Sequence, residues 1–135
     1  MDKGNNDKVT IYNAAECTFL DPSYILEQIK SSPKIKKAGM ILLHNGIVRA
    51  FSRNGLPITQ IRTAVDIEKL KQIINEALSM KGIIDVRVVI REGDLKIGED
   101  MMLLAVCGDI RENVISCLSN TLDRIKKEAI SKKEH

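Results

Sequence analysis

Cationic side chains are the residues of this sequence whose types and positions could do chemistry. They recur near the ends of predicted elements and comprise Arg49, Arg53, Arg62, Arg111, Lys126 and Lys133. Guanidinium and ammonium groups bind anions through charge and directed N–H donors, and sites are often built at strand ends and in loops. The pattern indicates an anionic ligand, with solvated surface charge as the alternative for each residue.

Two of these lysines, Lys126 and Lys133, are seven residues apart on one predicted C-terminal helix. Seven residues make about two helical turns, so we expect both amines on nearly the same face, where they could meet one substrate. Lysines near a helix C-terminus also interact favourably with the helix dipole, which is the alternative. Arg111 lies in the first turn of the same helix, where a cation opposes the dipole, and is expected to have another partner.

The sequence lacks the residues that other catalytic chemistries require. The chain has two histidines, His44 in an apolar strand and His135 at the end, too few for a histidine metal site or a Ser-His-Asp triad. We interpret His44 as a packed, hydrogen-bonded structural residue. The three cysteines lack CxxC spacing, and Gly93 and Gly98 lack the spacing of a nucleotide-binding loop. We therefore expect neither a metal nor a cofactor.

The composition predicts one globular domain. Of 135 residues, 44% are hydrophobic, the net charge is +3, and the aromatics are two Tyr and two Phe. Such a mild charge and so few rings for base stacking argue against nucleic acid as a partner. No apolar run could span a membrane, and the polar start does not resemble a signal peptide. We expect a cytoplasmic protein with a disordered lead-in over residues 1–8 and a single domain over 9–135.

Strand and helix patterns alternate along the chain. The predicted elements are a strand from Val9, a helix at about 21–31 capped by Asp21, a strand over 38–51 bent near Gly46, a turn at 52–57, a strand over 58–63, a helix over 66–80, two strands within 83–107, and a final helix with Asp109 as N-cap and Glu112 completing a capping box. The last two strands are predicted to be joined by a turn-rich segment around Gly93 and Gly98. This order favours an α+β domain with three helices on a mainly antiparallel sheet.

Four segments carry a resemblance to a known family. They are Gly46–Arg49 (GIVR), Val89–Asp100 (VIREGDLKIGED), Val106–Arg111 (VCGDIR) and Asp123–Lys126 (DRIK). On these segments, and from about Val9 to Glu134, the chain resembles the catalytic (large) subunit of molybdopterin synthase. The resemblance implies an α/β-hammerhead fold and a homodimer that forms a heterotetramer with a ubiquitin-like sulfur-carrier small subunit.

The resemblance also implies an activity and residues for it. The carrier's C-terminal thiocarboxylate would donate sulfur to a cyclic pyranopterin phosphate. By position, Lys126 matches a catalytic lysine and Lys133 the second one, with Lys132 as the alternative. Arg49 and Arg111 would hold anions, and Arg62 is a further candidate for substrate binding. A cationic pocket suits this chemistry because substrate, donor and departing carboxylate are all anionic.

The chain departs from the family pattern at several positions. Ile110 stands where the family has a histidine, and Arg62-Thr63 stands where it has a His-Tyr pair. The sequence ends at His135, whereas the family continues with a segment that covers the site. These departures leave a second hypothesis open, a non-catalytic relative that binds a ubiquitin-like partner or an anionic metabolite.

Overall fold

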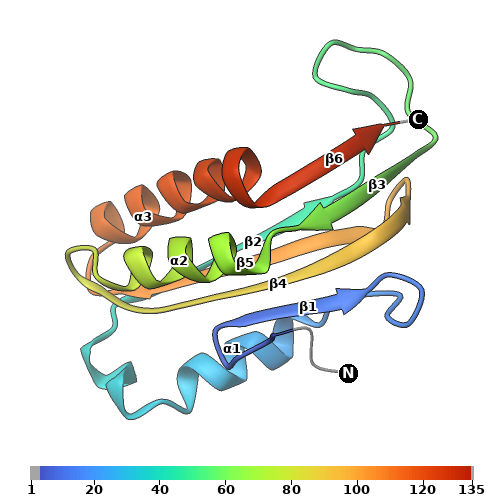
Figure 1. The fold of residues 1–135 in the computed structure, drawn as a ribbon. Helices are drawn as coiled ribbons and strands as arrows, with labels where there is room; N and C mark the ends of the chain where they lie inside the picture. Colours follow the sequence, from blue (N-terminus) through green and yellow to red (C-terminus); the bar gives the residue numbers. More distant parts are fainter. Residues whose placement is uncertain (1–3, 135) are drawn as a thin grey trace.

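The computed structural model describes residues 4–134, which form one sheet flanked by helices (Figure 1). Its elements are β1 (Val9–Asn13), α1 (Pro22–Lys30), the 3-10 turn η1 (Pro33–Lys37), β2 (Met40–Ile47), β3 (Gln60–Val65), α2 (Ile67–Leu78), β4 (Ile83–Lys96), β5 (Asp100–Gly108), α3 (Arg111–Arg124), the π-helical turn η2 (Ile125–Ala129) and β6 (Ile130–Glu134).

The six-stranded sheet has the order β2-β5-β4-β3-β6, with every neighbouring pair antiparallel, and β1 pairs in parallel with β4. The predicted α+β class with a mainly antiparallel sheet is therefore confirmed. On one side of β4, residues Val88–Glu92 pair with β1 and residues Gly93–Lys96 pair with β3. This long strand joins the two halves of the sheet.

Strand β5 shows why both faces of the sheet are covered. Its even-numbered residues, such as Leu104, pack with α2 and α3, and its odd-numbered residues, such as Leu103, pack with α1. Alternate side chains point to opposite faces of a strand, so a continuous apolar run can serve two cores. Figure 1 shows α2 and α3 side by side over one face, with α1 on the other.

The predicted turn-rich connection between the last two central strands is wrong in its extent. Strand β4 continues to Lys96, and the chain turns only over residues 97–99, where Gly98 has φ +85°. Leu95 is fully buried, in a cluster with Ile61 of β3. Burial of Leu95 and pairing with β3 keep this segment extended, and Gly93 supplies a strand position with φ +121°.

The start of α3 also differs from the prediction. Its N-cap is Ile110, which makes no side-chain capping bond, so the predicted capping box of Asp109 and Glu112 is absent. The Oδ1 atom of Asp109 instead accepts from the backbone N–H of Ile110 at 2.7 Å and from Nδ2 of Asn113 at 2.9 Å. These bonds lower the pKa of Asp109.

The predicted helix through Lys133 ends earlier. Arg124 is the last residue of α3, and after η2 the chain enters β6, which pairs with β3 from Val65 opposite Ile130 to Ile61 opposite Glu134. Residues 131–134 (SKKE) offer no apolar side chain to extend the buried helix stripe, whereas β3 offers an open edge. Pairing as a strand therefore replaces the helix.

The predicted disorder over residues 1–8 falls partly outside the described residues, because positions 1–3 are not among them. In the described part, Asn6 accepts hydrogen bonds from the backbone N–H groups of Lys8 and Val9 through Oδ1, both at 2.8 Å. Asn5 Oδ1 accepts from the N–H of Ile11 at 2.9 Å. Residues 5–8 are thus attached to the start of β1.

Candidate functional site

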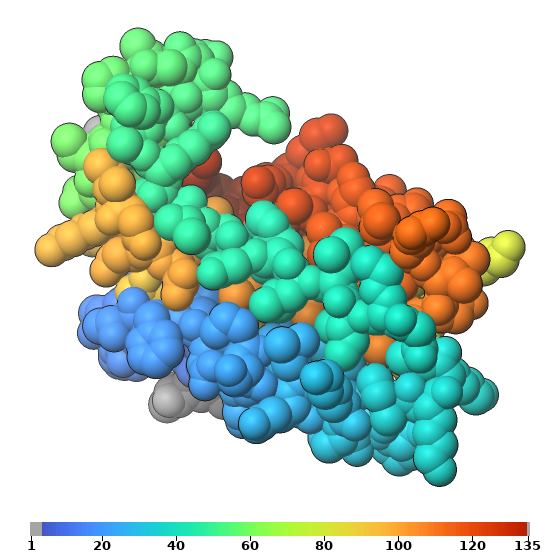
Figure 2. All heavy atoms as spheres, turned by 180° about the vertical axis from the view of Figure 1, so that it is seen from behind, coloured from blue at the N-terminus to red at the C-terminus, as the bar shows by residue number. Residues whose placement is uncertain are grey.

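An open cleft of about 650 Å³ lies between the end of β2, the loop 48–59 and the C-terminal segment 123–134. Figure 2 shows it as a hollow between the green loop and the red end of the chain. Its apolar lining includes Val48, Ile58, Ile61, Met101 and Ile130. This combination of an apolar base and converging polar groups is typical of small-molecule sites.

The charged lining of the cleft is mainly cationic. It comprises Arg49, Arg53, Lys126, Lys127 and Lys132, against Asp123 and Glu134. These residues come from β2 and its loop, from the end of α3 and η2, and from β6. The structure thus brings the predicted Arg49, Arg53 and Lys126 together with Lys132, the alternative second lysine, and adds Lys127.

Lys126 lies in η2, where the helix changes from α to π geometry before the chain becomes a strand. Such π-helical turns are rare and occur often at functional sites. Partial burial lowers the pKa of Lys126, and the positive charges of Lys132, Arg53 and Arg49 lower it further. An ammonium group with a lowered pKa releases its proton more readily than an exposed lysine does.

The end of β2 places Arg49 at the cleft. The pairing of β2 with β5 shifts register between Gly46 and Ile47, which is the irregularity that the sequence predicted near Gly46. Beyond it the chain is held by two backbone bonds, from the N–H of Val48 to the carbonyl of Glu99 at 3.0 Å and from the N–H of Gly98 to the carbonyl of Val48 at 2.7 Å. Arg49 follows this anchored residue.

Strand alternation separates the two C-terminal lysines. Lys132 lines the cleft together with Ile130 and Glu134, whereas Lys133 is not among the lining residues. The Nζ of Lys132 lies 3.6 Å from a carboxylate oxygen of Glu134. Because neighbouring residues of a strand point to opposite faces, the predicted shared face of Lys126 and Lys133 is replaced by one of Lys126 and Lys132.

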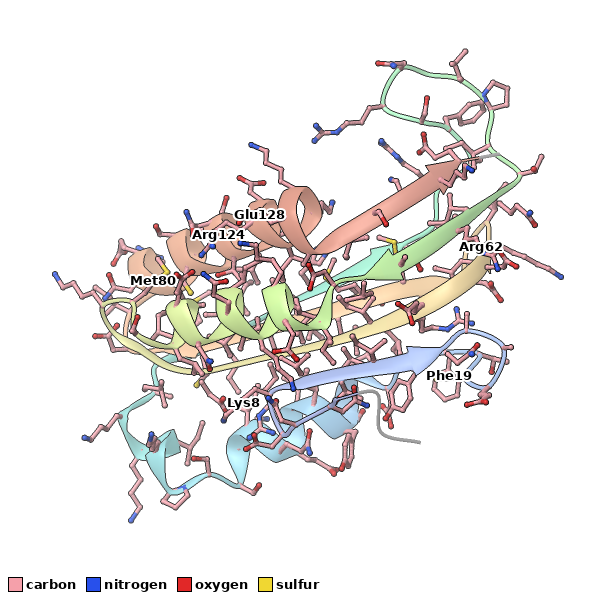
Figure 3. The ribbon with its side chains drawn as sticks, in the orientation of Figure 1. Lys8, Phe19, Arg62, Met80, Arg124 and Glu128 are labelled. Carbon is pink, nitrogen blue, oxygen red and sulfur yellow. The ribbon has the colours of Figure 1, made fainter. Side chains whose placement is uncertain are left out.

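Arg62 lies outside the cleft for the same reason. Its strand neighbour Ile61 lines the cleft, and Arg62 points away from it, with Nε 3.4 Å from Oδ1 of Asp94. Figure 3 shows Arg62 at the outer side of β3. Both side chains of this ion pair are more than half exposed. The predicted role of Arg62 in substrate binding therefore has no geometric support within one chain.

Arg111 lies at the opposite end of α3 from Lys126. Fifteen residues separate them, which corresponds to roughly 20 Å along a helix axis. Arg111 is exposed, and its Nε lies 3.3 Å from a carboxylate oxygen of Glu112. One copy of the chain does not bring Arg111 to the cleft.

His44 lines the cleft, although the sequence indicated only a structural role. It follows Leu42 on the face of β2 that packs toward α2 and α3, at the level where the helical segment carries Lys126. Burial lowers the pKa of His44, and the charge of Lys126 lowers it further. The alternation of Leu42, His44 and Gly46 on one strand face was the available signal.

Neither a metal cluster nor a membrane-spanning helix accompanies the cleft in the described part of the chain. Within residues 4–134, no group of three or more His, Cys, Asp and Glu side chains is placed to hold a metal ion. None of the helices there combines the length and apolar character that a bilayer crossing requires. The cleft combines cationic side chains with an apolar base, a lining that suits an anion with an apolar part.

Comparison with known proteins places the chain among relatives. The family model described as MoaE protein matches residues 18–128. A comparison with curated protein sequences finds no match.

Several solved structures have a similar fold. Molybdopterin cofactor biosynthesis protein E from Burkholderia multivorans superposes with a TM-score of 0.76 at 21% identity, covering 96% of this chain and 88% of that one. Molybdopterin synthase from Staphylococcus aureus gives 0.72 at 21% identity over 95% and 89%. A complex of subunits 1 and 2 of molybdopterin-converting factor from Helicobacter pylori gives 0.69 at 22% identity over 93% and 83%.

Proposed function

Because this chain belongs to the MoaE protein family, the large subunits of molybdopterin synthase in molybdenum cofactor biosynthesis, we propose that its cationic cleft transfers sulfur. The donor is a thiocarboxylated ubiquitin-like small subunit, and the acceptor is a cyclic pyranopterin monophosphate. The observation that carries this proposal is the amine of Lys126, set among Lys132, Arg53 and Arg49 in the cleft.

The charges of the cleft suit each participant in the reaction. The substrate phosphate and the donor thiocarboxylate are anions, and fixed cations bind them without reorganising during the reaction. In each transfer a C–S bond forms at a side-chain carbon of the pterin as a C–O bond of that carbon breaks, its oxygen leaving as water or staying with the phosphate, and the acyl–sulfur bond of the carrier breaks. Water supplies the oxygen of the carboxylate that leaves. Lys126 stabilises the negative charge that develops on this group and donates a proton.

The mouth of the cleft suits a protein donor. Ile47, which lines the cleft at the end of β2, is more than half exposed, as are Phe51 and Leu56 in the loop 48–59, other residues of which line the cleft. Exposed apolar side chains around a polar site are a common feature of protein interfaces. The complex of two subunits formed by the similar Helicobacter pylori protein supports a small-subunit partner.

A homodimer gives Arg111 a role that one chain does not. Since Arg111 lies at the far end of α3 from Lys126, it can reach a cleft of this kind only on a second copy. Its high exposure and its exposed pairing with Glu112 leave the guanidinium group available for such a contact.

The second candidate is a non-catalytic relative that binds the carrier or an anionic metabolite. The exposed Ile110, beside Arg111, favours it, because an apolar group offers no hydrogen bond to a substrate. Reconstitution separates the two. The purified protein is mixed with thiocarboxylated carrier and cyclic pyranopterin monophosphate, and dithiolene formation and carrier binding are measured. Product formation supports sulfur transfer, binding without product supports the second candidate, and absence of both contradicts both.

A further inference from the structure

The imidazole of His44 has an atom whose environment is incomplete. Its Nε2 is buried and has no hydrogen-bond partner, and it is the one side-chain nitrogen or oxygen found in this state among residues 4–134. An unpaired polar atom in a buried position destabilises the folded protein, and natural proteins satisfy nearly all such atoms. A buried imidazole nitrogen of this kind is expected to bind a partner that the free chain lacks.

The surroundings of His44 belong to the cleft. The residue lines the cleft beside Lys126, and its ring lies over Gly46, two positions along the same strand face. A Cβ atom added at Gly46 would stand 3.3 Å from Nε2 of His44, tighter than most carbon contacts. The absence of a side chain at Gly46 therefore leaves space around the imidazole.

We propose that His44 is a substrate-binding residue whose Nε2 forms a hydrogen bond with an uncharged N–H or C=O group of a nitrogen heterocycle bound in the cleft. This inference rests on the proposed function, and it assigns the ring of the substrate to the apolar base and the phosphate to the cations. Neutral imidazole offers one donor and one acceptor nitrogen, which suits such a group. Burial, and then the charge of Lys126, lower the pKa of His44 and so disfavour a charged imidazole at this place.

Two substitutions distinguish this role from a structural one. His44→Leu removes the unpaired polar atom and retains apolar volume, so we expect an unchanged or higher Tm. The KM for cyclic pyranopterin monophosphate should rise by about tenfold, the effect of losing one hydrogen bond. His44→Gln keeps a hydrogen-bonding group and should stay within about threefold of the wild type. A structural histidine would give the opposite result, a lower Tm in His44→Leu with KM unchanged.

A spectroscopic measurement tests the contact without turnover. In a His135→Gln variant His44 is the one remaining histidine, so its imidazole nitrogen signals need no further assignment. Titration with cyclic pyranopterin monophosphate should shift the Nε2 resonance, and inorganic phosphate alone should leave it in place. An unmoved Nε2 signal with saturating pterin, or an equal shift with phosphate alone, would overturn the proposal.

Different experimental outcomes would contradict the sulfur-transfer proposal and the His44 proposal. If the wild type binds the pterin with a shifted Nε2 signal and forms no dithiolene, sulfur transfer fails and the His44 contact stands. If the wild type forms dithiolene and His44→Leu keeps the wild-type KM, the His44 contact fails and sulfur transfer stands.

Discussion

Arg124 and Glu128 clamp the turn that carries Lys126. Nε of Arg124 donates to Oε2 of Glu128 at 2.9 Å, and the same guanidinium also donates to Glu76 of α2. Nζ of Lys69, also on α2, lies 3.7 Å from Glu128. Figure 3 labels Arg124 and Glu128 along the end of the C-terminal helical segment, beside α2. The network joins α2, α3 and η2, and the hydrogen bond from Arg124 lowers the pKa of Glu128.

We predict that Glu128→Gln loosens η2 and lowers kcat for dithiolene formation by roughly tenfold, because small misplacements of a reacting group are costly. The loss of Tm should be small, since the network is exposed to solvent. Glu27→Gln, at an exposed position on α1, is the matched control and should leave kcat unchanged. An unchanged kcat in Glu128→Gln would contradict a positioning role.

The stability difference between wild type and Glu128→Gln should depend on pH in a defined direction. A lowered pKa in the folded state means that the carboxylate stabilises the fold above its ordinary pKa of about 4.5, and that this contribution is lost as the pH falls through the folded-state value. The Tm difference between wild type and Glu128→Gln should therefore exist at pH 7 and vanish in acid. A difference that grows in acid would contradict the ion network.

The alkaline limb of the pH–rate profile reports on Lys126. If protonated Lys126 is the active form, kcat falls as the pH rises through its pKa, which lies below the ordinary 10.5. Lys132→Ala removes a neighbouring positive charge, raises the pKa of Lys126 and moves this limb to higher pH. Lys30→Ala, at the end of α1, should leave the limb in place. A limb that moves down in Lys132→Ala would contradict the electrostatic coupling.

Lys132 and Lys133 offer a test of the cleft within one dipeptide. Lys132→Ala should raise the KM for cyclic pyranopterin monophosphate by about tenfold, as expected for one charge-assisted contact. Lys133→Ala should change it little, because that side chain is outside the cleft. Steady-state kinetics of the two variants give both KM values. A larger rise in KM for Lys133→Ala than for Lys132→Ala would contradict the register of β6.

Substitution of Arg91 should lower the stability of the fold independently of any catalytic role. It is buried, and it donates to the backbone carbonyls of Cys17 at 2.6 Å, Asp100 at 2.9 Å and Ala14 at 3.1 Å. Arg91→Met leaves these oxygens without their donor and should lower the free energy of unfolding in urea by about 3 kcal/mol. The exposed Arg62→Met should cost under about 1 kcal/mol. Equal losses would contradict the bridging role of Arg91.

The sequence predicted most of the fold because local signals agreed with tertiary packing. Asp21 caps α1 and Asp66 caps α2, both through their side chains, and the apolar stripe of α2 is buried at Leu70, Ile73 and Ile74 as its spacing indicated. The failures lie where tertiary contacts prevail over local preference. Strand β6 exists because β3 offers it an edge, and no pattern within residues 130–134 reveals that edge.

The site was predictable only in part. Arg49 and Lys126 both line the cleft. Lys133 and Arg62 were also predicted for the site, but the face on which each of these side chains lies depends on strand register, which the sequence does not reveal. Arg111 stays a prediction, because it lies fifteen residues before Lys126 and its role depends on the proposed second copy. His44 was missed because a lone histidine in an apolar strand is usually structural, and only the unpaired Nε2 and the cleft distinguish it.

The central claim is that the amine of Lys126 acts in sulfur transfer within this cleft. The most direct measurement is dithiolene formation in a single turnover by wild type, Lys126→Ala and Lys30→Ala, each shown to be folded and to bind the thiocarboxylated carrier. We expect product with the wild type and with Lys30→Ala, and none above background with Lys126→Ala. Wild-type amounts of product from Lys126→Ala would contradict it.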